Sequence, residues 1–202
     1  MEPELGVPAL LIRHADQHDA RSLAALIEIA GDGIPGYLWA QMARPGETAL
    51  DVGEQRAARE EGGFSYRHAT VAEIARTVAG MILAYRLPDI SDEDRSALSE
   101  LPAFLRPFVE LEFEVPGSFY INAFAVHEPY RSRGIGSRLL RKVEGQAIEA
   151  GCRQLSVQHF ERNVRAGAFY RRHGFRAVGG RVLEPHPAHP YEDRSILMVR
   201  DI

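Results

Sequence analysis

Apolar residues near the start of the chain predict a strand followed by a helix. Residues 10–13 form a short apolar run that is typical of a strand. An N-cap at Asp16 or Asp19 then precedes an apolar series with the spacing of an amphipathic helix, made up of Leu23, Leu26, Ile27 and Ala30. The glycines and the proline within residues 31–36 end that helix.

The next two segments carry weaker patterns. Residues 37–42 are rich in aromatic side chains, and they either belong to the core or line a pocket. Residues 43–63 contain several glycines around a polar stretch, which predicts a loop with a short polar helix.

The middle of the chain predicts a hairpin, an insertion and a central strand. Two β-prone runs, at residues 69–74 and 78–87, are joined by a short polar connection, as in a hairpin. Residues 88–117 are acidic and interrupted by prolines, and we expect an insertion there with a helix that starts after an N-cap at Ser91. Residues 119–126 then form a strongly β-prone run, which Pro129 prevents from continuing.

The composition fits one globular domain that spans residues 1–202. A chain of 202 residues with 45% hydrophobic residues can bury a sizeable core. No apolar run approaches the roughly 18 residues that a membrane span requires, and the N-terminal residues carry acids rather than a basic leader flank. The single cysteine, Cys152, excludes an intrachain disulfide and a thiolate metal cage. We therefore expect a cytoplasmic protein with neither a membrane partner nor a metal.

The net charge of −4 conceals two oppositely charged halves. Residues 1–117 carry 10 Arg and 20 Asp or Glu, whereas residues 118–202 carry 14 Lys or Arg and 8 Asp or Glu. The first half is therefore net negative and the second net positive, so they should prefer opposite ligands. We do not expect a nucleic acid partner, because a surface that binds nucleic acid would normally dominate the net charge.

A turn with two glycines follows the run at residues 119–126. Gly134 and Gly136 let main-chain N–H groups approach an anion, and the start of the next helix offers unpaired donors and a partial positive charge. The nearby basic residues are Arg131, Arg133, Arg138, Arg141 and Lys142. This pattern fits a polyphosphate ligand, although a purely structural helix entry has similar features.

Comparison with known phosphate-binding motifs narrows the kinds of site that this glycine turn can form. The dinucleotide fingerprint GxGxxG fails because Leu139 occupies its third glycine position, and the chain contains no Gly-Lys-Ser or Gly-Lys-Thr of a P-loop. The pattern that matches is Arg-x-x-Gly-x-Gly at Arg131, Gly134 and Gly136.

A second constellation follows a β run at residues 155–157. Asn163 is a natural N-cap, Ala166 and Tyr170 share one face of the predicted helix, and Gly174 is placed to end it before a strand that starts at Phe175. Capping and packing explain most of these residues, and an aromatic residue on such a helix is more often part of the core than of a reaction.

The two constellations in this order resemble the GNAT superfamily of acyl-CoA-dependent N-acetyltransferases. The resemblance is dense over about residues 118–178, and a last strand at residues 196–200 is compatible with the same fold. It implies an α/β (α+β) fold, a twisted mixed β-sheet flanked by helices, as a single domain with an insertion before the central strand. It also implies that residues 118–202 bind coenzyme A and that residues 1–117 shape the acceptor side.

The resemblance also implies roles for individual residues. The main chain of Phe124, Ala125 and Val126 would pair with the pantetheine arm, and Asn163 would touch that arm. The turn that holds the pyrophosphate would consist of Arg131, Ser132, Arg133, Gly134, Ile135, Gly136 and Ser137. Tyr170 would protonate the leaving thiolate, whose pKa of about 8.5 makes a nearby proton donor useful.

The group that deprotonates the acceptor amine stays open. Many members of the superfamily place a Glu on the strand before the turn, where this chain has Asn122, which cannot act as a base. Glu110, Glu112 and Glu114 alternate with apolar residues, as on a solvated strand face, and are alternatives together with Glu28 and Asp32. The histidines near the motifs, His127, His159 and His173, and the pair His186 and His189 are better explained as structural residues.

The leading hypothesis is an enzyme that transfers acetyl from acetyl-CoA directly to a primary amine in a ternary complex. The acceptor would be a small molecule or a peptide, attracted by the acidic half of the chain, and a homodimer is compatible with the pattern. The first alternative is an acyl-CoA-binding sensor or regulatory module with little catalysis, which Asn122 motivates. The second is a structural or protein-binding domain whose glycine turn is only a helix entry. The sequence does not identify the acceptor, the preferred acyl chain or the oligomeric state.

Overall fold

The computed structural model describes residues 9–202, and in this part of the chain seven strands form one sheet in the order β1-β2-β3-β4-β5-β7-β6. The strands are β1 (Leu10–His14), β2 (Ala69–Ile74), β3 (Thr77–Arg86), β4 (Phe119–Val126), β5 (Gln154–Phe160), β6 (Arg176–Leu183) and β7 (Asp193–Asp201). The helices are α1 (Ala20–Ala30), α2 (Ile34–Met42), α3 (Ala49–Ala57), α4 (Asp92–Ala97), α5 (Arg106–Glu112), α6 (Ile135–Glu149) and α7 (Val164–Arg172). This is the mixed sheet flanked by helices that the sequence predicts.

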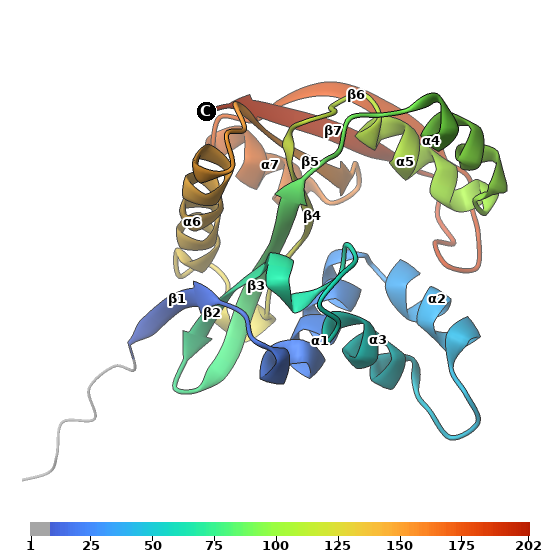
Figure 1. Cartoon of the computed structure of the whole chain (residues 1–202). Coiled ribbons are helices and arrows are strands. Elements are labelled where there is room, and N and C mark those ends of the chain that lie inside the picture. Colours follow the sequence, from blue (N-terminus) through green and yellow to red (C-terminus); the bar gives the residue numbers. More distant parts are fainter. Residues whose placement is uncertain (1–8) are drawn as a thin grey trace, which may run out of the picture.

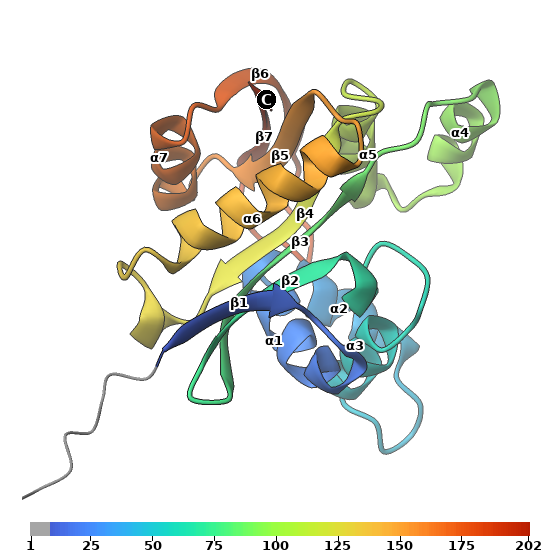
Figure 2. The same cartoon turned by 60° about the vertical axis from the view of Figure 1, so that its left-hand side comes forward.

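The sheet is mixed because one pair of central strands is parallel. Strands β1 to β4 are joined antiparallel, as are β5, β7 and β6, and β4 and β5 run parallel. Figures 1 and 2 show the two parts of the sheet diverging where β4 and β5 meet. The parallel pair therefore lies at the junction between the N-terminal and C-terminal parts of the fold.

Helices cover both faces of this sheet (Figure 1). On one face α6 packs through an apolar stripe that includes Leu139, Leu140 and Val143, all at most 1% exposed. On the other face α1 and α3 pack over the β1 to β4 part, and α5 packs over the β5 to β7 part. Alternating side chains of β3 serve both layers, with Ile82 facing α6 and Met81 and Leu83 facing α1.

The aromatic segment at residues 37–42 falls in α2 and has two roles. Trp39 is 2% exposed and packs in the core, with its ring over Gly53 of α3, where a Cβ atom would come within 2.5 Å of it. Tyr37 instead meets the rings of Phe104 and His186, which come from the insertion and from the β6–β7 connection. The predicted short polar helix after this segment is α3, with Thr48 as its N-cap.

The insertion contains the predicted helix and a second one. Ser91 caps α4, as expected, through a hydrogen bond from the main-chain N–H of Asp94 to its hydroxyl. The expectation of a strand face at Glu110, Glu112 and Glu114 is wrong, since Glu110 and Glu112 lie in α5 and Glu114 follows its end. A five-residue alternation fits either element, and Pro107 at the first turn of α5 favours the helix.

The sequence analysis argued against a basic leader and against a membrane span. The argument from the acidic N-terminal residues rests largely on residues 1–8, which lie outside the described part of the chain. Within residues 9–202, no helix is both long enough and apolar enough to span a bilayer.

Candidate active site

The two central strands, β4 and β5, stop pairing in the middle of the sheet. Pairing between β4 and β5 covers Phe119 to Ile121 on β4 and stops there. Beyond this point β4 continues to pair with β3 as far as Val126, and β5 continues to pair with β7 as far as Phe160. Residues 122–126 of β4 therefore have no strand partner on the β5 side among the described residues, and we call this segment the open edge of β4.

A β-bulge marks the start of the open edge. Leu83 of β3 pairs with Ala123, whereas the next residue, Ala84, pairs with Ile121, so Asn122 is the extra residue on β4. Bulges re-aim the side chains around them and are frequent beside functional sites. The amide of Asn122 donates to the main-chain oxygen of Gly63 at 3.4 Å, which is consistent with a positioning role and not with that of a base.

The glycine turn lies at the far end of the open edge and leads into α6. Gly134 occupies the N-cap position with φ of 76°, a left-handed conformation that glycine adopts without strain. A Cβ atom there would meet nothing within 4 Å, so the main chain faces open space. No side chain of residues 9–202 caps α6, and its first N–H groups remain available to an anion.

The residues of the turn differ in their exposure to solvent. Arg131, Ser132, Arg133 and Gly134 are exposed, whereas Ile135 is buried under the helix and Gly136 and Ser137 are partly buried. The Nε–H group of Arg131 donates to the main-chain oxygen of Val126 at 2.9 Å. This bond fixes the turn to the end of β4 and occupies one carbonyl that the sequence analysis assigned to the pantetheine arm.

Helix α7 brings the second constellation to the same region. Asn163 is its N-cap, because its side-chain oxygen accepts from the N–H of Ala166 at 3.0 Å. Phe124 of the open edge meets the rings of Phe169 and Tyr170, with ring centroids 5.5 and 6.5 Å apart. The structure therefore brings together the open edge, the turn and Tyr170.

Tyr170 is 5% exposed and lies among aromatic rings. Besides Phe124, its neighbours are His159 and Phe175, at centroid distances of 6.1 and 5.4 Å. Burial raises the pKa of the Tyr170 hydroxyl well above its usual range, because the phenolate would lose its hydration. The hydroxyl therefore keeps its proton at neutral pH, which a proton donor requires.

His159, His186 and His189 make hydrogen bonds or ring contacts within the fold. The Nδ1 atom of His159 lies 2.9 Å from the main-chain oxygen of Phe160, and burial lowers the pKa of this imidazole. His186 stacks on Phe104 and His189 on Phe160, so both anchor the β6–β7 connection. Within residues 9–202, no group of three or more His, Cys, Asp or Glu side chains could hold a metal ion.

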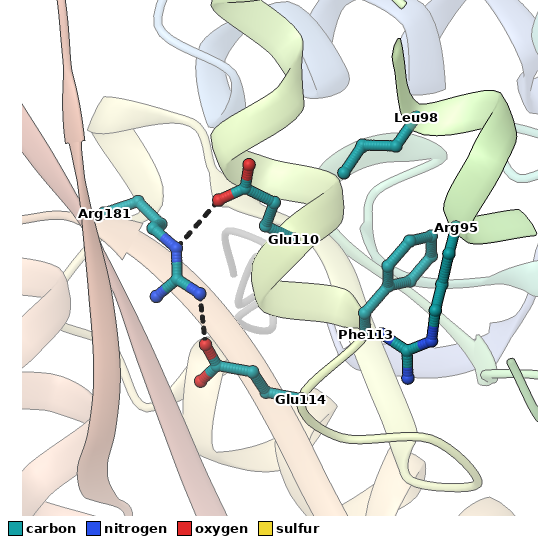
Figure 3. A pocket seen from close by; sticks show the side chains of 6 residues that line it. All are labelled: Arg95, Leu98, Glu110, Phe113, Glu114 and Arg181. Atoms are coloured by element: carbon teal, nitrogen blue, oxygen red, sulfur yellow. Dashed lines mark hydrogen bonds and ion pairs between the residues drawn. The ribbon is translucent and has the colours of Figure 1, made fainter.

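Four of the five carboxylates considered as a base are engaged elsewhere. The carboxylate of Glu28 accepts from the N–H of Gly36 at 2.5 Å, and Asp32 pairs with Arg162. Glu110 and Glu114 both pair with Arg181 of β6, at 2.9 and 2.6 Å (Figure 3). Figure 3 also shows the small pocket that these three side chains line together with Arg95, Leu98 and Phe113.

Glu112, the fifth carboxylate, lies in α5 and takes no part in the ion pairs with Arg181. Tyr120 of β4, two residues before the bulge, is 4% exposed. Burial raises the pKa of Glu112 to about 7, and the hydrogen bond from Tyr120 works against this rise. The same burial, together with the charge of Glu112, raises the pKa of Tyr120. Tyr120 and its neighbour Tyr85 were not selected from the sequence, because nothing in a β-prone run distinguishes them from core residues.

A family model describes this architecture. The model of the Acetyltransferase (GNAT) family matches residues 37–175, which is more than half of the chain. The chain therefore belongs to this family of acetyltransferases, as the two motifs predicted.

Individual relatives agree with this assignment. The chain is 34% identical over 93 residues to a tRNA(Met) cytidine acetyltransferase of Aeropyrum pernix, a match that covers 44% of this chain and only 12% of that protein. An N-acetyltransferase from Staphylococcus aureus has a TM-score of 0.65 and 22% identity, covering 94% of this chain and 100% of that chain. A polyamine N-acetyltransferase of Drosophila melanogaster that forms N-acetylagmatine has a TM-score of 0.68 and 14% identity, covering 96% and 100%. Likeness at these low identities shows a shared fold.

Proposed function

We propose that this protein transfers an acetyl group from acetyl-CoA directly to a primary amine in a ternary complex. The observation that carries the proposal is the convergence of three features: the open edge of β4, the uncapped start of α6 and the buried hydroxyl of Tyr170. An extended thioester that lies along the open edge would place its phosphates at one end and its sulfur near Tyr170. The cytoplasm is the setting that we propose for this reaction.

The turn would hold the pyrophosphate of coenzyme A. Main-chain N–H groups at residues 131–137 and the partial positive charge of the helix start attract phosphate oxygens. Arg133 and Arg138 are exposed beside the turn and add positive charge. Of the open edge, Phe124 and Ala125 are the residues whose main chain we assign to the pantetheine arm, since Arg131 already occupies the carbonyl of Val126. Asn163 keeps its amide N–H groups for the same arm while its oxygen caps α7.

Tyr170 would supply the proton for the leaving group. The amine nitrogen attacks the thioester carbonyl carbon, the C–S bond then breaks, and the electron pair leaves with the sulfur. The phenol gives its proton to the sulfur as the C–S bond breaks, and the nitrogen loses a proton as it becomes an amide and returns one to the phenol oxygen, so that no phenolate is left. General acid catalysis of this kind contributes about 10²–10⁴-fold. Because burial keeps the Tyr170 phenol neutral, the proton is in place before the bond breaks.

The acceptor side would lie over the face of the sheet that carries α1 and α5. The acidic residues of this half favour a cationic amine by Coulomb attraction. We propose a small-molecule or peptide amine as the acceptor and no nucleic acid. The names of two relatives give different acceptors, agmatine for the Drosophila enzyme and cytidine of tRNA for the Aeropyrum enzyme. Agmatine and cytidine therefore both belong in the test.

The test measures the release of free thiol from acetyl-CoA with agmatine, an alanine-terminated peptide and cytidine as acceptors. Turnover with an amine that requires Tyr170 supports the proposal. Binding of coenzyme A without turnover would instead support a sensor. The absence of a thermal shift would leave only a structural domain, because a ligand at about 100 times its Kd stabilises a protein by about 2.7 kcal/mol.

A further inference from the structure

The connection between β6 and β7 borders a cavity of about 610 Å³. Three segments line this cavity: the end of β6 with the residues after it, the start of β7 with the residue before it, and the two residues that follow β5. None of the residues assigned above to coenzyme A, to the leaving group or to the base lines it. The proposed function therefore leaves this cavity without a role.

The lining of the cavity is negative. It contains four carboxylates and two guanidinium groups, those of Glu161, Glu184, Glu192 and Asp193 and of Arg162 and Arg194, which leaves a formal charge of −2. The three glutamates are exposed, and within residues 9–202 none of them forms an ion pair. Because residues 118–202 as a whole are net positive, this local negative charge opposes the composition of the half in which it lies.

Asp193 is the buried carboxylate of this lining. Its side chain is 3% exposed, and its Oδ1 atom accepts from the main-chain N–H groups of Arg162 and Arg194 at 3.2 and 2.8 Å. Its Oδ2 atom accepts no hydrogen bond, although Nε of Arg162 and Nε2 of His189 lie 3.4 and 3.6 Å away. A buried carboxylate oxygen without a hydrogen bond costs free energy, so this oxygen is the acceptor that a ligand with N–H groups would use.

The charge of Arg162 is already engaged. Its guanidinium group pairs with Asp32, between α1 and α2, and its Cζ atom lies 3.7 Å from the ring centroid of Tyr191. Among residues 9–202, Arg194 is then the one cation of the lining that forms no ion pair. The three exposed glutamates outnumber it, which favours a cationic ligand.

The rest of the lining is apolar and indicates the kind of cation. Val182 is 68% exposed, which is unusual for a large apolar side chain, and Leu183 and Pro185 continue the apolar part. Apolar surface beside carboxylates fits an ammonium group on an alkyl chain, because the charge meets the acids while the methylene groups cover Val182. A bare metal ion fits less well, since no group of three or more ligating side chains within residues 9–202 could hold one.

We propose that this cavity binds an alkylammonium cation, which Glu184 and Glu192 attract and which donates a hydrogen bond to Asp193. The site goes beyond the proposed function and stands without it, because no residue of the proposed reaction centre takes part. Exposed charge pairs contribute little each, so the affinity should lie in the millimolar range. Two sources supply such a cation, a free amine and the far end of an extended acceptor.

Titration of the full chain with butylammonium chloride tests the site, followed through its main-chain amide signals in NMR spectra. We expect saturable shifts at residues 182–185 and 192–194. Sodium pentanoate carries the same butyl chain with the opposite charge and should cause none. The affinity for butylammonium should also fall as sodium chloride is added, because salt screens exposed charges. Equal shifts with both compounds, or shifts confined to other parts of the chain, would overturn the proposal.

Variants of exposed carboxylates test the assignment without disturbing the core. Glu184→Gln and Glu192→Gln each remove one charge and keep the shape of the side chain. Each should weaken the binding of butylammonium by about threefold, and the two together by about tenfold. Glu149→Gln, an exposed carboxylate at the end of α6, is the matched control and should leave the affinity unchanged. Equal affinity in every variant would show that these carboxylates form no site.

Turnover separates the two sources of the cation. If the far end of an acceptor occupies the cavity, Glu184→Gln should raise the KM of a diamine by about threefold and leave the KM of butylamine unchanged. If both KM values stay unchanged while the binding of butylammonium weakens, the site takes a separate amine. If the unmodified protein acetylates no amine, the proposed function fails, whereas the NMR titration still decides whether the cavity binds a cation.

Discussion

The hydroxyl of Ser137 lies 2.9 Å from Nε2 of His173, and this contact joins the first turn of α6 to the end of α7. The other ring nitrogen of His173 lies 2.8 Å from the main-chain oxygen of Phe169, so Nδ1 donates and Nε2 accepts from Ser137. The proposed phosphate-binding turn is thus tied to the helix that carries Tyr170. A ligand that orders the turn would also fix the position of the phenol.

Removing the contact between Ser137 and His173 should destabilise the protein where α6 meets α7. We expect Ser137→Ala to lower the free energy of unfolding by about 1 kcal/mol, the typical net value of one intramolecular hydrogen bond. Ser132→Ala, on the exposed part of the turn, is the control and should change stability by less than about 0.5 kcal/mol. Urea denaturation of the three proteins measures the difference, and equal stabilities would argue against the contact.

Gly134 and Gly145 give a matched pair within one element. Gly134→Val places a branched side chain at a φ of 76° and in the open space before α6, so it should weaken coenzyme A binding by more than about 10-fold. Gly145→Ala, inside α6 with open space around its Cβ position, should leave binding unchanged and stabilise the protein by about 0.5–1 kcal/mol. Calorimetric titration with coenzyme A checks binding, and thermal denaturation checks stability. Unchanged affinity in Gly134→Val would remove the turn from the site.

Tyr170→Phe should affect the reaction more than the binding of the donor. Loss of the proton donor predicts a fall in kcat of about 100-fold, with the Kd of acetyl-CoA changed by less than about twofold. The exposed Tyr191 provides the control Tyr191→Phe, which should keep the rate of the unmodified protein. Equal losses of rate and affinity in Tyr170→Phe would indicate that this side chain only packs.

The sequence predicts the elements around the turn because their signals are local. A glycine turn at Gly134 before a helix, an N-cap at Asn163 and an apolar stripe on α6 each depend on a few neighbouring residues, and the structure has all three. The mixed sheet and its flanking helices follow from the family to which these motifs point.

The proposed acceptor side is harder to predict because its contacts join distant segments. Asp32 and Arg162 are separated by 130 positions, and no local pattern indicates that they pair. The alternation at residues 110–114 fits a strand or a helix, and only Pro107 and the spacing of Phe108, Leu111 and Val115 favour the helix. Read with a helical period, the same residues would have placed Glu112 on the buried stripe.

The ion pair between Arg13 and Asp19 should control acid stability. Arg13 donates two hydrogen bonds to the Asp19 carboxylate, at 2.7 and 2.9 Å, and thereby ties β1 to the start of α1. Burial works to raise the pKa of Asp19, but the hydrogen bonds from Arg13 and from the N–H of Asp16 outweigh it, so this pKa is lowered below its ordinary value of 3.8.

A lowered pKa in the folded state means that the unfolded chain binds the proton more tightly. The stability that Asp19 contributes is therefore fully present above about pH 4 and is lost as the pH falls through the lower, folded-state pKa. We expect Asp19→Asn to cost about 2 kcal/mol at pH 7, with the difference from the unmodified protein shrinking below pH 4. Glu60→Ala, which breaks an exposed pair with Arg67, should cost less than about 1 kcal/mol. Urea denaturation between pH 3 and pH 7 measures both variants, and a pH-independent difference for Asp19→Asn would show that packing and not charge holds β1 in place.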